Sequence, residues 1–428
     1  MRVVGQLDST FAWDGRRLLG DEDLGPGREP PAALRGAVGS VAGEGDRRRI
    51  VRDPLGIDKL FWATNGGGIA VAARPARLIA EGFALEDVSA VPRGAVVDVD
   101  SDGVSERARL SLDRAEPVSE LEQGGRSIRA ALDGYLAALA SANEGADVYV
   151  CLSGGLDSTG IAALVAEHFP GATGVSFDLA GGEPSADRVA GQRVARELDL
   201  PLLEADASEQ ELLEHLDTVL VDGVDWRDFN VHAGLVNAVL AKAVSEASGR
   251  FGRPLVFTGD LANEFLIDYA AERYEGVTYY ELPRLSPRML RTSLVRGLDT
   301  SHREVGVFEA FGIPVVQPYA VAVDTYLALP EEFLLLPERK ERLCRTIFGG
   351  RLPRFVYERP KARAQTGGGE GAGVLGACLR HGIDAERLRA RFAGLHGVED
   401  LSALDRFVRA GLYRSALPST AEEARERG

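Results

Sequence analysis

One six-residue segment, Ser153–Ser158 (SGGLDS), combines the residue types that bind phosphate groups. Its two glycines allow a tight turn with backbone amides pointing inward. The segment follows an apolar run at 147–153 and precedes a helix that we expect to begin at Ser158, whose positive N-terminal end favours an anion. Asp157 is suited to hold Mg²⁺, because hard cations prefer carboxylate oxygens. The segment predicts a pyrophosphate-binding loop; the plainer alternative is a capped turn between a strand and a helix.

Two other phosphate-binding motifs are excluded. A Walker loop needs Gly-Lys-Ser/Thr, and none of the four lysines follows a glycine. The only GxGxxG pattern, Gly371–Gly376, follows a glycine-rich stretch, whereas a dinucleotide-binding fingerprint follows a strand.

The elements around the loop predict an α/β fold with a parallel sheet. Strand-like runs at 147–153, 173–179 and 254–259 alternate with helical patterns at 158–168, 186–198 and 231–247, which is typical of βαβ units. Residues 114–144 read as a helix, and 284–350 as mostly helical. Before them, short strand-like runs between Arg49 and Asp100 predict a small β-rich unit. We therefore expect two domains, 1–113 and 114–428.

Composition narrows the function class. The net charge is −16 and the pI about 5.0, which argues against nucleic acid or an anionic membrane as a partner. No uncharged run reaches the ~18 residues of a membrane helix, so we expect a cytoplasmic protein. Three scattered cysteines and six dispersed histidines predict neither a disulfide framework nor a zinc site. The 49 basic residues include only four lysines, so each lysine is a mild candidate for a role that needs a compact point charge.

Several segments together resemble the asparagine synthetase B-type ATP pyrophosphatases, including the β-lactam synthetases and lasso-peptide cyclases. The likeness covers about residues 50–365. It rests on SGGLDS and on the following segments: Arg52–Gly56, Leu60–Trp62, Val91–Gly94, Val175–Phe177, Asp187, Thr258–Glu264 and Arg359–Lys361.

The resemblance implies a synthetase domain that uses ATP and Mg²⁺, preceded by a small β-rich remnant of an Ntn-type glutaminase domain. It implies Lys361, Asp260 and Glu264 as catalytic residues, and Asp157 and Asn263 as metal ligands. The nucleotide-binding residues that it implies are Leu152, Ser153, Gly154, Gly155, Asp157, Ser158, Val175, Ser176, Phe177, Thr258 and Gly259.

The chain also departs from the family pattern. Family glutaminases carry a cysteine nucleophile after the initiator methionine, whereas residue 2 is Arg2 and no cysteine precedes Cys151. We therefore expect no glutamine hydrolysis, because the thiolate is missing. Asp260 stands where asparagine synthetases carry Glu, and Asn263 where they carry a metal-binding Asp. The plainer alternative makes Asp260 a helix N-cap. His302 is either a pocket residue or an exposed helix-end histidine.

The expected function is AMP-forming amide or C–N bond synthesis, in which a small-molecule carboxylic acid is adenylated and then transferred to ammonia or another amine. Specialised-metabolite biosynthesis fits best, since primary asparagine synthesis of this type keeps its glutaminase. A homodimer is compatible with this reading. The alternatives are an intramolecular cyclase like the β-lactam synthetases and a non-catalytic nucleotide- or partner-binding homologue.

Overall fold

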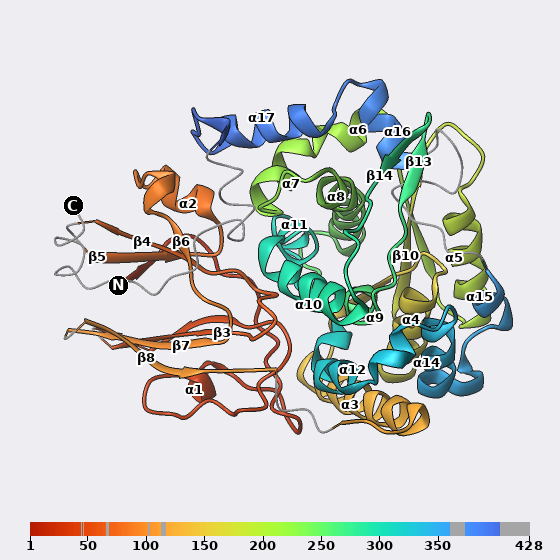
Figure 1. Ribbon diagram of the computed structural model, residues 1–428, viewed down its shortest axis with the longest axis horizontal. Helices are drawn as coiled ribbons and strands as arrows, with labels where there is room; N and C mark the ends of the chain where they lie inside the picture. The colour runs from red at the N-terminus through yellow and green to blue at the C-terminus, as the bar shows by residue number, and fades with distance from the viewer. Residues whose placement is uncertain are drawn as a thin grey trace.

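A computed structural model describes residues 1–43, 45, 47–65, 68–101, 103–112, 117–359 and 373–402 (Figure 1). Among these residues, no helix is both long enough and apolar enough to cross a membrane.

The N-terminal part is a sandwich of two four-stranded sheets. Side chains from both sheets, among them Ile50, Trp62, Val71 and Val97, form one buried cluster between them. Alternate residues of the strands face different apolar clusters, since Ile50 and Val97 belong to the cluster between the sheets and Val51 and Val96 to another. One sheet has the order β1 (Arg2–Val3), β5 (Gly68–Ala72), β4 (Phe61–Asn65), β6 (Ser89–Ala90), and the other β2 (Gly39–Ala42), β3 (Arg48–Arg52), β7 (Ala95–Asp100), β8 (Gly103–Arg109). Short helices flank them: α1 (Asp21–Leu24), α2 (Pro75–Ala80) and the 3₁₀ turn η1 (Leu85–Asp87).

The second part is built on a five-stranded sheet in which every neighbouring pair is parallel. Its order is β11 (Leu202–Ala207), β10 (Thr173–Leu179), β9 (Asp147–Cys151), β12 (Pro254–Phe257), β15 (Val315–Val316). The chain winds outward from β9 through β10 to β11, and then returns to the other side of β9. Such a reversal opens a crevice at the carboxyl ends of the two central strands. The sheet confirms the predicted α/β fold class.

Helices cover both faces of this sheet (Figure 1). Right-handed crossovers put the two helices α4 (Leu156–His168) and α5 (Ala186–Glu197) on one face and α8 (Asp228–Ser248) on the other. The other helices of this part are α3 (Leu121–Ala142), α6 (Glu209–Glu214), α7 (Leu216–Asp222), α9 (Ala262–Leu266), α10 (Pro287–Gly297), α11 (Val305–Glu309), α12 (Val323–Ala328), α13 (Glu331–Leu334), α14 (Arg339–Phe348), α15 (Arg354–Glu358), α16 (Gly373–Arg380) and α17 (Ala385–Leu395). The remaining elements are the hairpin β13 (Glu272–Tyr274) and β14 (Val277–Tyr279), and the 3₁₀ turns η2 (Leu298–Thr300), η3 (Pro318–Ala322) and η4 (Gly349–Arg351).

Helix α3 connects the two parts of the molecule. Its residues Ile128, Leu132, Tyr135 and Leu139 lie on one helical face and are buried, as their spacing predicts. The hydroxyl of Tyr135 donates to the backbone oxygen of Phe11 at 3.1 Å. One continuous apolar cluster includes residues from both sides of position 113. The predicted boundary at that position therefore stays a prediction about chain organisation, and the core does not divide there.

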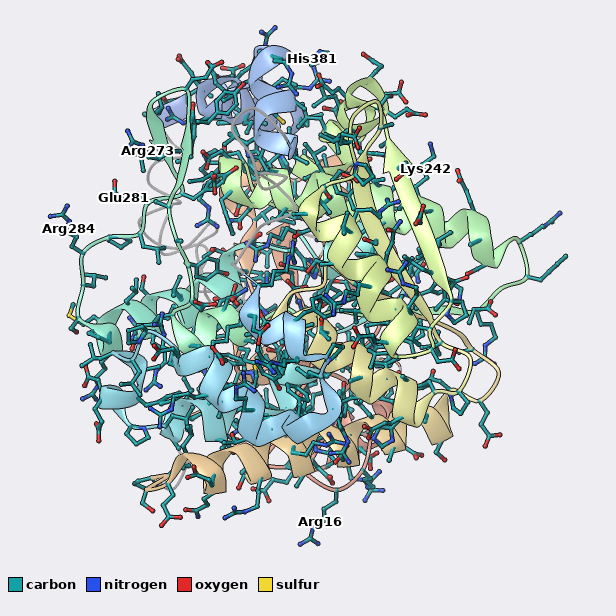
Figure 2. The ribbon with its side chains drawn as sticks, turned by 90° about the vertical axis from the view of Figure 1, so that its right-hand side faces the viewer. Arg16, Lys242, Arg273, Glu281, Arg284 and His381 are labelled. Carbon is teal, nitrogen blue, oxygen red and sulfur yellow. The ribbon has the colours of Figure 1, made fainter. Side chains whose placement is uncertain are left out.

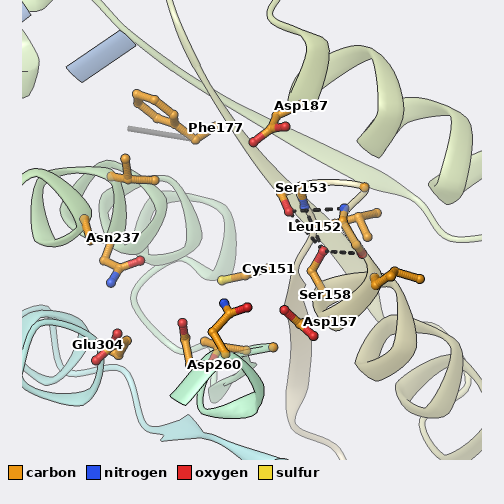
Figure 3. Close-up of a pocket in the computed structure, with 18 of the residues that line it drawn as sticks. Cys151, Leu152, Ser153, Asp157, Ser158, Phe177, Asp187, Asn237, Asp260 and Glu304 are labelled. Carbon is orange, nitrogen blue, oxygen red and sulfur yellow. Dashed lines mark hydrogen bonds between the residues drawn. The ribbon is translucent and has the colours of Figure 1, made fainter. Parts of the chain in front are cut away.

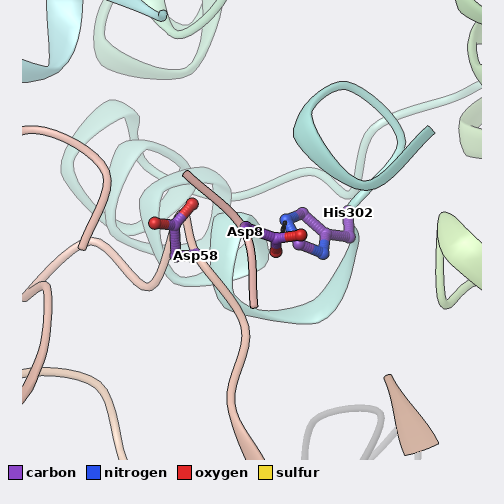
Figure 4. A group of neighbouring side chains, drawn as sticks. All are labelled: Asp8, Asp58 and His302. Carbon is purple, nitrogen blue, oxygen red and sulfur yellow. Dashed lines mark ion pairs between the residues drawn. The ribbon is translucent and has the colours of Figure 1, made fainter. Parts of the chain in front are cut away.

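Buried charges also join the two parts. Arg52 forms an ion pair with Asp299 at 2.5 Å, and the ammonium of Lys59 donates to the backbone oxygen of Leu298 at 2.8 Å. Nε2 of His302 lies 3.2 Å from the carboxylate of Asp8, to which it points in Figure 4. His302 is only 2% exposed, so the alternative of an exposed helix-end histidine is wrong. Burial and the cation of Arg74 lower the pKa of His302, which keeps the ring neutral.

Asp58 differs from the other buried charged residues between the two parts of the molecule, because its carboxyl group has no described hydrogen-bond partner. Its side chain is fully buried, and neither carboxyl oxygen has a hydrogen-bond partner. Burial first, and then the nearby carboxylates of Asp8, Asp53 and Glu309, raise the pKa of Asp58 well above its usual range. An uncompensated buried charge is costly, so Asp58 is protonated and neutral in the folded protein.

We predict that Asp58→Asn changes the free energy of unfolding by less than about 1 kcal/mol at neutral pH. An amide has the shape of the protonated acid. Folding raises the pKa of Asp58 above the ordinary carboxyl value that it has in the unfolded chain. The contribution of Asp58 to the stability of the folded state is therefore complete below the ordinary pKa, and it is lost as the pH rises through the raised pKa. Chemical unfolding of the variant between about pH 5 and 8 should therefore depend less on pH than that of the wild type.

Asp8→Asn is the matched comparison, because Asp8 accepts two hydrogen bonds from Arg74 at 2.9 and 3.0 Å. Its removal should cost about 3–5 kcal/mol. If Asp58→Asn destabilised the protein as much as Asp8→Asn, Asp58 would be ionised in the folded state.

Candidate active site

The loop between β9 and α4 has the geometry of an anion-binding turn (Figure 3). Gly154 has φ +71°, and a Cβ at this position would lie 2.4 Å from Cβ of Ala190, so no side chain fits. The amide of Ser153 donates to Oγ of Ser158 at 3.3 Å, and the two hydroxyls lie 3.1 Å apart. Helix α4 begins at Leu156, earlier than the predicted Ser158. Its N-terminal end therefore faces the loop, which favours bound negative charge.

The segment after β12 lies directly against this loop. A Cβ on Gly259 would be 2.6 Å from the backbone nitrogen of Ser158, so only glycine allows this contact. Leu261, the N-cap residue of α9, has φ +82°, a conformation that is strained for a residue with a side chain. Asp260 precedes this cap and is not the N-cap itself, so the capping alternative for Asp260 is wrong. This turn holds residues 258–264 beside the phosphate loop.

The two segments enclose a cavity of about 310 Å³. Phe177 and Val175, from the carboxyl end of β10, form an apolar wall, and Asp187 lies beside them in Figure 3. All eleven predicted nucleotide-binding residues line this cavity, as do Asp260, Asn263 and Glu264. The structure thus brings the predicted site together, with the exception of Lys361. Pro360 and Lys361 lie outside the described residues, while Arg359 lines the cavity and donates to the backbone oxygen of Ser153 at 3.1 Å.

The predicted metal ligands surround Lys340, a residue that the sequence analysis did not assign. Its ammonium pairs with the carboxylate of Asp157 and donates to Oδ1 of Asn263 at 2.8 Å. Oδ2 of Asp268 lies 3.0 Å away. Burial alone would lower the pKa of Lys340, but the two carboxylates raise it, so the side chain stays charged. A cation therefore belongs among these oxygens.

This donor set also fits Mg²⁺. Carboxylate and amide oxygens are the ligands that hard cations prefer. Oδ1 of Asp157 is buried without a hydrogen-bond partner, which leaves one oxygen directed into the cluster. The role of Asp157 and Asn263 as metal ligands stays a prediction, and Asp268 is a third candidate that the sequence did not indicate.

A second cluster of charges surrounds Asp260. Burial first, and then repulsion from Glu304, raise the pKa of Asp260 to about 7. Arg303 forms ion pairs with Glu304 at 2.5 Å and with Glu264 at 3.5 Å. The hydroxyl of Tyr269 donates to Glu264, and burial raises the pKa of Tyr269, which keeps that proton in place. Asp260 can thus gain or lose a proton near neutral pH, as a general base must.

Lys340, Arg303 and Glu304 lie in the site but were not predicted from the sequence, and only Lys340 had a sequence feature that could have indicated it. Among the scarce lysines, Lys59 joins the two parts of the molecule, Lys242 lies at the surface (Figure 2), and Lys340 lies in the site. Scarcity therefore pointed to Lys340. Arginine and glutamate are common in this chain, so nothing distinguished Arg303 or Glu304.

Comparison with known protein families gives a match over part of the chain. Residues 137–305 match the family model described as asparagine synthase. The matched range contains the phosphate loop, the 258–264 segment, Arg303 and Glu304, and it excludes Lys340 and the N-terminal sandwich. No curated protein matches the chain.

Solved structures show only distant likenesses. NMN synthetase from Francisella tularensis is 9% identical, with 69% of this chain and 98% of that chain covered and a TM-score of 0.34. An NH3-dependent NAD synthetase from Campylobacter jejuni is 15% identical, with 40% and 73% covered and a TM-score of 0.26. The U34-tRNA thiolase NcsA from Methanococcus maripaludis is 14% identical, with 65% and 78% covered and a TM-score of 0.26.

We predict that Lys340→Met destabilises the protein by about 1–3 kcal/mol, because it leaves two partly buried carboxylates without their cation. Added Mg²⁺ should then raise the melting temperature of this variant more than that of the wild type, since the same oxygens can bind the metal. Thermal unfolding with and without Mg²⁺, in the absence of nucleotide, measures both effects.

Lys242→Met, which removes a surface lysine, serves as the control and should change stability by no more than about 0.5 kcal/mol. An equal response of wild type and Lys340→Met to Mg²⁺ would argue against a metal site among these oxygens.

Proposed function

We propose that this chain, whose residues 137–305 form an asparagine synthase domain, is an ATP-dependent, AMP-forming synthetase of amide or other C–N bonds. The observation that carries the proposal is the single cavity lined by the phosphate loop, the 258–264 segment and Lys340. In the first half-reaction, a carboxylate oxygen of the acid attacks the α-phosphorus of ATP. The bond to the β-phosphate breaks, and pyrophosphate leaves.

The described residues can support this step by binding the leaving group. Backbone amides of the Ser153–Ser158 loop and of the N-terminal end of α4 can donate hydrogen bonds to phosphate oxygens. Lys340, at the edge of the same cavity, can neutralise charge that develops on pyrophosphate. Mg²⁺, if held by Asp157 and Asn263, would supply further neutralisation of phosphate charge.

In the second half-reaction, the amine nitrogen attacks the acyl carbon, and the bond from that carbon to AMP breaks. The nitrogen must lose a proton, and Asp260 is suited to accept it because its pKa is about 7. Ammonia or an amine would be the nitrogen source, without glutamine. The role of Lys361 at pyrophosphate and the acyl oxygen remains a proposal based on the Arg359-Pro360-Lys361 resemblance.

The N-terminal sandwich is proposed to be a scaffold derived from a glutaminase domain. Its contacts support this role, because Arg52, Lys59 and Asp8 hold the segment that leads to Arg303 and Glu304.

A second candidate is intramolecular ring closure, as in β-lactam synthetases. The hydrogen bond from Tyr269 to Glu264 supports it, because the resemblance gives β-lactam synthetases a Tyr–Glu base. The Tyr of those enzymes stands at the position of Asp260, however, and the carboxylate at this position argues against ring closure. An acid that carries its own amine would then give a cyclic product and AMP with no second substrate. Mass spectrometry of single-substrate reactions distinguishes the two candidates.

We predict that turnover of ATP yields AMP and pyrophosphate, because the loop lacks the features of a Walker motif. Chromatography of the nucleotide products and a pyrophosphate-release assay measure this. Asp157→Asn should slow the reaction at least ~10²-fold, because it removes the carboxylate that would hold Mg²⁺ at the leaving pyrophosphate. Formation of ADP and phosphate would contradict the proposal, and a chain that binds ATP without turnover would favour the non-catalytic alternative.

We also predict that amide formation rises with pH, with a midpoint near the pKa of about 7 for Asp260. Below this pH the carboxyl group is protonated and cannot accept the proton of the amine. Asp260→Asn should lose amide formation while it retains acid-dependent exchange of pyrophosphate into ATP, which reports the first half-reaction. A pH profile that is the same in the wild type and Asp260→Asn would exclude Asp260 as the base.

A further inference from the structure

A second cavity, of about 430 Å³, adjoins the nucleotide cavity. The two cavities share a wall formed by Phe229, Glu264, Tyr269, Arg303 and Glu304. The nucleotide cavity contains the phosphate loop on its other side. A molecule in the second cavity would therefore meet ATP at this shared wall.

Most of the surface of the second cavity is apolar, although about half of the residues that line it are polar or charged. The ring of Phe229 lies 5.2 Å from that of Tyr280 and 5.7 Å from that of Tyr269, in edge-to-face arrangements. Such a lining is typical of sites for largely apolar ligands. The aliphatic part of the lining consists of Ile57, Leu261, Leu282, Pro283, Leu290, Leu294, Leu298 and Val305.

The cations at this cavity already have partners. Arg227 forms an ion pair with Asp225 at 2.5 Å, and Arg303 is paired with Glu304 and Glu264. The acidic residues Asp228 and Glu281 also line the cavity. Among the described residues, the cavity thus offers no uncompensated positive charge for a second carboxylate away from the shared wall. A ligand with one acid group and an apolar body fits this distribution of charge.

We infer that the second cavity binds the hydrocarbon body of the acid substrate, and that this substrate is a monocarboxylic acid with an aromatic or branched apolar body. This inference rests on the proposed function. The carboxylate must reach the α-phosphorus, so it lies at the shared wall near Arg303, and the body extends toward Leu290 and Leu294 of α10.

Aspartate fits this cavity poorly. Its second carboxylate would lie against the leucine wall or beside Asp228 and Glu281, and burying an unpaired charge is costly. It would also leave most of the apolar surface uncovered. The amine is a poorer choice of occupant than the acid, because the amine enters only after the acyl-adenylate has formed.

Stable analogues of the acyl-adenylate, acyl-sulfamoyl adenosines, test this inference without turnover. Calorimetry with the full chain would compare a phenylpropionyl, an acetyl and an aspartyl analogue, with ATP binding measured separately. The phenylpropionyl analogue should bind at least ~10-fold more tightly than the other two. Leu294→Asp should abolish that preference and leave ATP affinity unchanged.

Met289→Asp is the matched control, since Met289 lies on the same helix, is 59% exposed and lines neither cavity. It should retain the preference of the wild type. Equal or tighter binding of the aspartyl analogue, or a preference that survives Leu294→Asp, would overturn the assignment of the cavity. Pyrophosphate exchange with free acids, in the absence of amine, gives the kinetic counterpart.

The two proposals fail in different ways. Exchange supported by aspartate and not by aromatic acids would leave the proposed function intact and refute the substrate class. A chain that binds the phenylpropionyl analogue with the expected preference, and yet supports no exchange with any acid, would retain the cavity assignment and contradict the proposed function. If reactions with ATP, acid and amine showed a preference for apolar amines and none for apolar acids, the cavity would be assigned to the amine and the inference would be refuted.

Discussion

The close approach of two backbones at the carboxyl edge of the parallel sheet is the constraint on which the site depends. Strands β9 and β12 are neighbours, and the segments that follow them meet where Gly259 lies against Asp157 and Ser158. On the other side of the loop, Gly154 lies against Ala190 of α5. A single methyl group at either glycine would push the loop away from its neighbour. The cavity therefore exists because two residues have no side chain, and the strained turn at Leu261 then directs Asp260 and Asn263 into it.

The charges in the site are arranged as two separate clusters, which match the two halves of the proposed reaction. Lys340 lies among Asp157, Asn263 and Asp268, on the side of the phosphate loop. Arg303 lies among Glu264 and Glu304, on the side of Asp260. In each cluster a buried cation is balanced by carboxylates, so the folded chain tolerates several acidic groups around a site for a negatively charged ligand. A bound phosphate or metal ion would replace an existing partner of these charged side chains. Binding would therefore not bring a new charge into an apolar interior.

The N-terminal sandwich acts on the site through the segment between α10 and α11. Lys59 and Arg52 hold Leu298 and Asp299, and Asp8 contacts His302, the residue directly before Arg303. The next residues, Arg303 and Glu304, form part of the wall between the two cavities. A β-rich unit with no described contact to the phosphate loop thus fixes the position of groups next to Asp260. The apolar cluster shared by both parts makes this arrangement a single packed body.

The fold class and the local elements of the candidate nucleotide site follow from the amino-acid sequence alone. The loop SGGLDS, the flanking strands and α3 follow from spacing over a few residues, because helices and strands impose a local period on side chains. Tertiary structure decided which distant residues join them. Lys340 follows the loop by 183 positions and Arg359 follows Ser153 by 206, and nothing local marks either contact. The pKa of Asp260 and the burial of His302 also depend on tertiary structure, because folding determines which charges and apolar groups surround a side chain.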